Sequence, residues 1–329
     1  EPEDHTVRLL IKLALIGAIA LFVSGCGGTS SPPPAVDDPV SQPTGSISIS
    51  LTDGPWEEAQ SLVLRITGVE LGHAGMGVVP LEMPGGPMSV DMMQLQNGAY
   101  QALVSGMTVP AGQYEWMRLQ IDLSQSHFDS ATGARHNMQM GPNSSDGLEI
   151  HQIFEVAESS HEEFMLDFDL RQGVHRHDMG MMGDQYELHS AMRLIDMQDS
   201  GGMTGLVHGA MIDVNHPGCD DDPGGNWAYL FHGDTTDPDD ISAVDTDGRP
   251  GPIATDRVEM DSSTGEFSYH FGYLPGGSYR VAFTCSGEWD EDGDDDYPSD
   301  ADGQFDFQYF SGPTEVVHGQ LHRLDLSAP

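Results

Sequence analysis

The chain has 329 residues, with 53 acidic and 12 basic side chains and a formal net charge of −41 at pH 7. This negative field repels the phosphate backbone of nucleic acids, so we expect no nucleic-acid partner. The only lysine is Lys12. The acidic excess is typical of a surface adapted to saline water, although local acidic clusters can also collect divalent cations.

The N-terminal segment has the layout of a secretory signal peptide. Arg8 and Lys12 precede an apolar run of about 11 residues, shorter than the roughly 20 that a membrane-spanning helix needs. The sequence VSGC that ends at Cys26 resembles a bacterial lipobox, in which the cysteine is acylated and becomes the first residue. We therefore predict a signal peptide at 1–25 and a membrane partner held through a lipid anchor on Cys26. We expect the protein in the cell envelope, with the outer membrane favoured because Gly27 and not an aspartate follows the cysteine.

Residues 26–44 are rich in proline, glycine and serine, and we expect a flexible, disordered tether. Residues 45–197 alternate apolar and polar side chains with a period of two, which predicts half-buried strands in a β domain. Long amphipathic helical stretches are missing. The predicted strands lie at 45–52, 61–71, 114–123, 164–170 and 186–195.

These segments carry a resemblance to a known family. GSISISLTDGPWEEAQSLVLRITGVEL, followed by VDMMQLQNG, VPAGQYEWMRLQID and FMLDFDL, is similar to domain-of-unknown-function family 4382 over residues 44–196. That family is a bacterial lipoprotein domain, so the resemblance implies a cell-envelope context. It implies no catalytic residues.

A second β domain is predicted after a glycine-rich hinge at 198–204. Residues 205–329 resemble the carboxypeptidase-regulatory-like (prealbumin-like) β-sandwich, through the Leu-Pro-Gly-Gly-Ser-Tyr turn at 274–279. Val-Pro-Ala-Gly-Gln-Tyr at 109–114 echoes this turn, and in both we expect the tyrosine ring to point inward. The fold class is therefore all-β, with two antiparallel β-sandwich domains.

The three cysteines have separate predicted roles. With Cys26 acylated, Cys219 and Cys285 form the simplest disulfide in an oxidising compartment. A zinc site needs several cysteine or histidine ligands at short spacing, whereas only His216 lies near Cys219 and none lies near Cys285, which argues against zinc.

No motif requires a cofactor, but two acidic loops, at 219–226 and 289–307, are candidates for a calcium site. Alternating aspartates can direct several carboxylates to one Ca²⁺ ion. The loop is not an EF-hand, because Tyr297 stands where a glycine should turn it when counting from Asp292. The alternative is a solvated acidic loop. The candidate ligands are Asp220, Asp222, Asp290, Asp292, Asp294, Asp296, Asp300 and Asp302.

A second candidate metal site combines imidazole and thioether groups, which suit copper. His175 and His177 share one face of a strand, and Met179 and Met181 follow. The alternative interpretation is a flexible hairpin loop.

Catalytic motifs are not evident. The sequence has no Gly-x-Ser-x-Gly, His-Glu-x-x-His or phosphate-binding loop. Asp167 and Asp169 could act as a glycosidase acid and base, but solvent exposure on one strand face is the simpler interpretation. We predict a non-enzymatic envelope protein with a binding or structural role, such as adhesion, envelope organisation or capture of a glycan or protein ligand. The alternatives are a carbohydrate-binding or carbohydrate-active protein, for which Trp56 and Trp289 could stack sugars, and a copper-binding protein.

Overall fold

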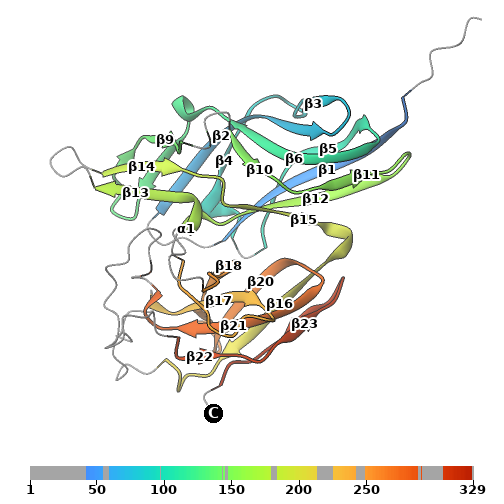
Figure 1. Cartoon of the computed structure of the whole chain (residues 1–329). Helices are drawn as coiled ribbons and strands as arrows, with labels where there is room; N and C mark the ends of the chain where they lie inside the picture. The colour runs from blue at the N-terminus through green and yellow to red at the C-terminus, as the bar shows by residue number, and fades with distance from the viewer. Residues whose placement is uncertain are drawn as a thin grey trace, which may run out of the picture. The chain divides into compact units, whose positions relative to one another are not determined.

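The computed structural model describes residues 42–54, 59–96, 98–142, 144, 147–178, 184–212, 225–241, 249–287, 290 and 307–327. Residues 42–329 form one compact unit. Its fold is all-β, as predicted (Figure 1). Within the described ranges, the longest helix is far too short to cross a membrane. These helices are α1 (Leu170–Gly173) and the 3₁₀ turns η1 (Met92–Gln94), η2 (Leu123–Gln125) and η4 (Met197–Asp199).

A four-stranded sheet has the order β15-β12-β1-β5. Side chains alternate along a strand, so the sequence TGSISISLTD of β1 sends its apolar residues to one face. Ile47, Ile49 and Leu51 are fully buried there. The strands are β1 (Thr44–Asp53), β5 (Gln101–Pro110), β12 (His161–Phe168) and β15 (Met192–Asp196).

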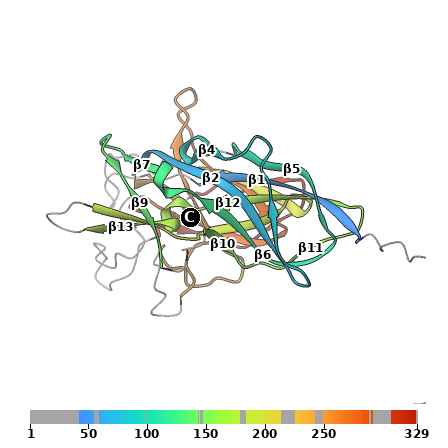
Figure 2. The same ribbon diagram turned by 90° about the horizontal axis from the view of Figure 1, so that it is seen from above.

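An eight-stranded sheet covers the same core. Its path is β10-β6-β2-β7-β8, with β3 and β4 added to β2 and β11 added to β6. Figure 2 shows β2 and β6 running side by side. Leu62, Leu64 and Ile66 of β2 are fully buried and pack with the residues of β1 in one cluster. The strands are β2 (Ala59–His73), β3 (Gly77–Leu81), β4 (Met88–Asp91), β6 (Gly112–Ile121), β7 (His127–Ser130), β8 (Arg135–His136), β10 (Leu148–Ile150) and β11 (Phe154–Val156).

A small third sheet, β13-β14-β9, closes one end of this core. Val174, Tyr186 and Leu188 belong to the same buried cluster. The strands are β9 (Met138–Met140), β13 (Val174–Asp178) and β14 (Asp184–Leu188).

Two further sheets follow, with the orders β19-β20-β16-β24 and β18-β17-β21-β22, the latter joined by β23. Their core includes Leu230, Phe271 and Val281, and Trp227 is fully buried. We call these two sheets the C-terminal β part and the first three the N-terminal β part. The strands are β16 (Ser200–Val207), β17 (Trp227–His232), β18 (Ala254–Arg257), β19 (Glu259–Met260), β20 (Phe267–Pro275), β21 (Gly277–Thr284), β22 (Tyr309–Phe310), β23 (Thr314–Val316) and β24 (Leu321–Arg323).

The sheets are mixed, which differs from the purely antiparallel arrangement that we predicted. β1 pairs with β12, β9 with β14, and β16 with β24 in parallel. Alternating side chains fix which face of a strand is buried, but they carry no information on the direction of its partner.

The glycine-rich stretch predicted as a hinge at 198–204 lies mainly in β16, which pairs with β20 and β24. The glycines permit close backbone contact there. A Cβ atom on Gly201 would lie 2.6 Å from the carbonyl oxygen of Val317, and one on Gly205 would overlap the carbonyl oxygen of Leu324. These glycines therefore serve packing between strands.

The two matching turns have the same side-chain contact. Tyr114 and Tyr279 are both buried, which confirms the predicted inward rings. The hydroxyl of Tyr114 donates to the carbonyl oxygen of Pro110 at 2.7 Å, and that of Tyr279 donates to Pro275 at 2.8 Å. Each tyrosine thus fastens the turn that precedes its own strand.

Candidate functional site

An acidic cavity of about 50 Å³ lies where the ends of β1 and β12 meet β18 and β20. Among the described residues, four carboxylates and one guanidinium reach its lining. Both β parts contribute to it. The lining residues are Thr52, Asp53, Gly54, Gly98, Asp167, Asp169, Arg193, Ala254, Thr255, Asp256, His270, Phe271, Gly272 and Tyr273.

Asp53 is the most unusual of these residues. It follows Leu51 by two positions, so the alternation of β1 directs its side chain to the buried face. It is 5% exposed, and neither carboxylate oxygen makes a hydrogen bond. Burial, followed by the charges of Asp167 and Asp169, raises the pKa of Asp53 well above its usual value.

Asp167 and Asp169 are engaged by neighbouring groups. Asp167 lies opposite Arg193 in the pairing of β12 with β15 and forms an ion pair with it. Asp169 caps α1, where its Oδ1 accepts from the amides of Arg171 at 3.1 Å and Gln172 at 3.3 Å. We predicted solvent exposure for both aspartates. Strand alternation correctly put them on one face, but β18 and β20 cover that face.

The C-terminal β part supplies Asp256 and Tyr273. Asp256 Oδ2 accepts from the amide of His270 at 2.6 Å, and burial raises the pKa of Asp256 to about 8. Tyr273 has a positive φ of 52°, and its hydroxyl donates to the carbonyl oxygen of Gly98 at 2.9 Å. Sequence reasoning missed Asp53 and Asp256, although Asp53 stands inside the Leu-Thr-Asp-Gly-Pro stretch that marks the family resemblance.

A buried arginine joins the two β parts beside this cavity. Arg171 of α1 is 6% exposed. Its Nη2 donates to the carbonyl oxygens of Gly287 at 2.6 Å and Asp290 at 2.7 Å, and its Nη1 lies 3.4 Å from the hydroxyl of Tyr229. The guanidinium carbon also sits 3.9 Å from the ring centre of Trp227. Arg171 therefore combines hydrogen bonds with a desolvated cation–π contact.

The structure gives Asp290 a different role from the predicted calcium ligand. Its Oδ2 accepts from the hydroxyl of Tyr229 at 2.6 Å, and its carboxylate accepts from the amide of Ile241. Burial raises the pKa of Asp290 to about 7, and the nearby charge of Arg171 opposes that shift. A cation beside this carboxylate would face the guanidinium. The other candidate ligands lie outside the described residues: Asp220, Asp222, Asp292, Asp294, Asp296, Asp300 and Asp302.

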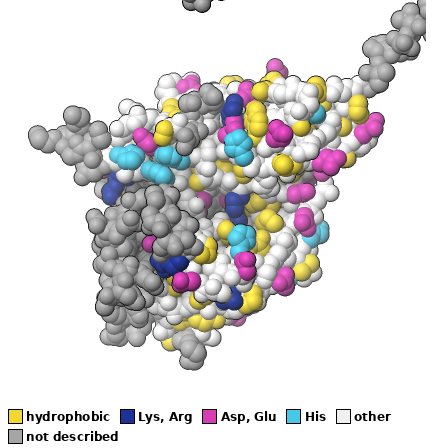
Figure 3. All heavy atoms as spheres, viewed as in Figure 1, with side chains coloured by type: hydrophobic (Ala, Val, Ile, Leu, Met, Phe, Trp, Pro, Cys, Tyr) yellow, Lys and Arg dark blue, Asp and Glu magenta, His cyan; other side chains and the backbone are white. Residues whose placement is uncertain are grey.

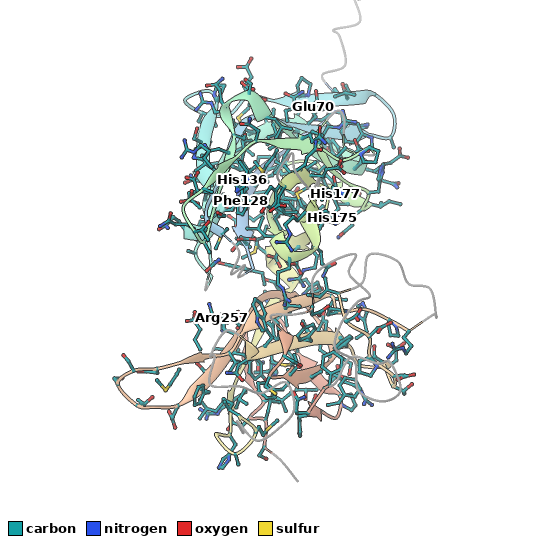
Figure 4. All side chains as sticks on the ribbon, turned by 90° about the vertical axis from the view of Figure 1, so that its left-hand side faces the viewer. Glu70, Phe128, His136, His175, His177 and Arg257 are labelled. Carbon is teal, nitrogen blue, oxygen red and sulfur yellow. The ribbon has the colours of Figure 1, made fainter. Side chains whose placement is uncertain are left out.

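His175 and His177 do lie on one strand, β13, as Figure 4 shows. The ring of His175 stacks on that of His189 with centroids 4.0 Å apart, whereas His177 Nε2 lies 3.4 Å from a carboxylate oxygen of Glu187. Met179 and Met181 lie outside the described residues. Across the described ranges, no three His, Cys, Asp or Glu side chains are already arranged around one metal position. Copper binding stays a prediction.

The cysteines are described only in part. Cys285 is buried and directly follows the last residue of β21. Its predicted partner Cys219 and the predicted lipid attachment site Cys26 lie outside the described residues. The disulfide and the anchor stay predictions.

The surface agrees with the composition. On the face in Figure 3, acidic side chains are spread widely and Lys and Arg side chains are few. A wider, open recess of about 620 Å³ is lined by residues that include His232, Asp234 and Arg249.

Comparisons with known proteins show similarity at low identity. The Bacillus anthracis TIE protein is 8% identical with a TM-score of 0.18, over 86% of this chain and 34% of that one. The chain thus spans about a third of that protein's length. A variant of BcpA, the major pilin subunit of Bacillus cereus, is 9% identical with a TM-score of 0.18, over 86% of this chain and 69% of that one. No curated protein matches the sequence.

Residues 44–189 match the family described as Domain of unknown function (DUF4382), which confirms the resemblance seen in the sequence of this part of the chain.

Proposed function

We propose that this protein is a lipid-anchored, non-catalytic envelope protein whose two β parts act together as one binding or structural unit. The lipid on Cys26 would hold it at a membrane, and residues 26–44 would separate the folded unit from that surface. Adhesion, envelope organisation and ligand capture all fit this description.

The observation that carries the proposal is the buried contact of Arg171. A guanidinium from α1 is enclosed by Trp227 and by carbonyl oxygens of the C-terminal β part. A permanent, desolvated contact of this kind favours a fixed arrangement of the two parts. The acidic cavity argues against a glycosidase acid and base at Asp167 and Asp169, because about 50 Å³ is far below the roughly 300–1,000 Å³ of ordinary small-molecule sites.

The anchor is tested by expressing the full chain with its signal in a bacterial host. We expect incorporation of radiolabelled palmitate and recovery in the membrane fraction. Cys26→Ser should lose both. Recovery of the unmodified wild-type chain in the soluble fraction would contradict the proposal.

The role is tested by capture of partners from native membranes with the intact lipoprotein. Saturable binding of an envelope protein or glycan, without change to that ligand, is the expected result. An enzyme acting through the Asp167 and Asp169 pair would instead release reducing sugar from envelope glycans, and Asp167→Asn would abolish the release.

A further inference from the structure

The acidic cavity contains a buried carboxylate, that of Asp53, for which the described residues supply no hydrogen bond. We propose that it binds one partly hydrated divalent cation, Mg²⁺ or Ca²⁺, with Asp53 as the principal ligand. This inference goes beyond the proposed function, and it concerns a different place from the acidic loops considered in the sequence.

The first step is the state of Asp53. Its side chain is 5% exposed, and both oxygens lack a hydrogen bond. An isolated buried carboxylate is very unfavourable unless it is paired, coordinates a metal or becomes neutral. The amides of Gly54 and Leu170 lie close enough to favour the charged form, but neither makes a hydrogen bond of good geometry.

The second step is the surrounding charge. Arg193 supplies the one guanidinium among the lining residues that the structure describes, and it pairs with Asp167. Asp169 is used by the first turn of α1. Asp256 adds another carboxylate from β18. No guanidinium among the described lining residues is therefore left for Asp53, and the carboxylates would repel an anionic ligand.

The third step is size. A cavity of about 50 Å³ can hold about three to five water-sized positions, since one water needs roughly 10–15 Å³. A sugar ring does not fit this space. A cation with two or three of its own waters does.

A partly hydrated cation needs few ligands from the protein. Within the described ranges, no three acidic side chains already converge on one metal position. Mg²⁺ usually keeps several waters and binds through one or two carboxylates, and Ca²⁺ also accepts water among its ligands. Asp53, supported by Asp256 across the cavity, is enough for such a site.

A proton on Asp53 is the competing explanation. It would neutralise Asp53 without linking it to any other group of the cavity. A divalent cation would balance two charges and would connect β1 with β18, one strand from each β part.

The test uses the purified full chain, stripped with a chelator and dialysed, at pH 8 and constant ionic strength. MgCl₂ and CaCl₂ are titrated in separate calorimetric experiments on the wild type and three variants. Asp53→Asn removes the principal ligand at constant size. Glu155→Gln, on the exposed face of β11, is the matched control. Asp292→Asn with Asp294→Asn reports on the acidic loop.

We expect one site in the wild type, unchanged in the control and loop variants, and weakened at least tenfold in Asp53→Asn. The arm with the higher affinity identifies the cation. If Asp53→Asn does not fold, Asp256→Asn carries the same test, with the same expected loss. The proposal is overturned if the wild type binds neither ion at millimolar concentration, which would leave Asp53 as a neutral buried acid. It is equally overturned if binding survives in Asp53→Asn or is lost in the loop variant. None of these results depends on the lipid anchor or on a partner.

Discussion

Replacement of Arg171 by methionine tests whether a buried cation holds the two β parts together. The substitution keeps an unbranched apolar stem but removes the donors to Gly287 and Asp290 and the cation over Trp227. Hydrogen bonds from a charged group contribute about 1.5–3 kcal/mol each, and a desolvated cation–π contact about 2 kcal/mol. Burial of the methionine offsets part of this sum. We expect Arg171→Met to lower the free energy of unfolding by about 3–5 kcal/mol, the range found when one partner of a buried ion pair is removed.

Equilibrium urea unfolding at pH 8, followed by tryptophan fluorescence, measures this loss. Arg135→Met is the matched control, because Arg135 is 61% exposed and pairs with Asp129 at the surface. Such pairs contribute little, so the control should unfold close to the wild type. The double variant Arg171→Met/Asp290→Asn should recover about 1–2 kcal/mol, since it also removes the carboxylate left without its cation. Equal stability of Arg171→Met and Arg135→Met would refute the reasoning.

Three further changes are expected to have measurable effects. Burial raises the pKa of Asp290 from 3.8 to about 7, so the folded chain keeps a proton that the unfolded chain releases near pH 4. The contribution of this group to stability is therefore fully present below about pH 4 and is lost as the pH rises to about 7. Asp290→Asn should flatten a plot of the urea midpoint against pH between about pH 4 and about pH 7. Gly205→Ala should lower the melting temperature through overlap with the carbonyl oxygen of Leu324, at a cost of about 1–3 kcal/mol. Gly209→Ala, where a Cβ meets nothing within 4 Å, should leave it almost unchanged. Tyr279→Phe removes one hydrogen bond to a turn carbonyl. The free energy of unfolding measured in urea should fall by about 1 kcal/mol. No change in it would show that the turn does not need this hydrogen bond.

Much of the fold could be predicted because strand alternation is a local property. The predicted strand at 45–52 is β1, and the inward tyrosines of both turns are confirmed. The direction of each neighbouring strand could not be predicted. β1 pairs with β12, more than 100 residues later in the chain, and nothing in either strand specifies a parallel partner.

The candidate site was harder to predict because long-range contacts define it. Asp290 stands at the start of a run of aspartates, which suggests a solvated loop. Its partner Arg171 is 119 residues away, and only the folded chain reveals it. Asp53 and Asp256 are single acidic residues within strands, so the sequence gives no sign that they share a cavity.

The run from β12 into α1 connects both buried features. Asp167, Asp169 and Arg171 are spaced two residues apart, and they place two carboxylates at the acidic cavity and one guanidinium in the C-terminal β part. Each β part has its own apolar core, since every cluster of buried hydrophobic residues belongs entirely to one part. Charged groups make the contact between the parts that lies beside the cavity. Buried charges tolerate few alternative partners, because a misplaced ion would be left uncompensated. We therefore expect the contact between the two β parts to respond to pH and to cations more strongly than either core.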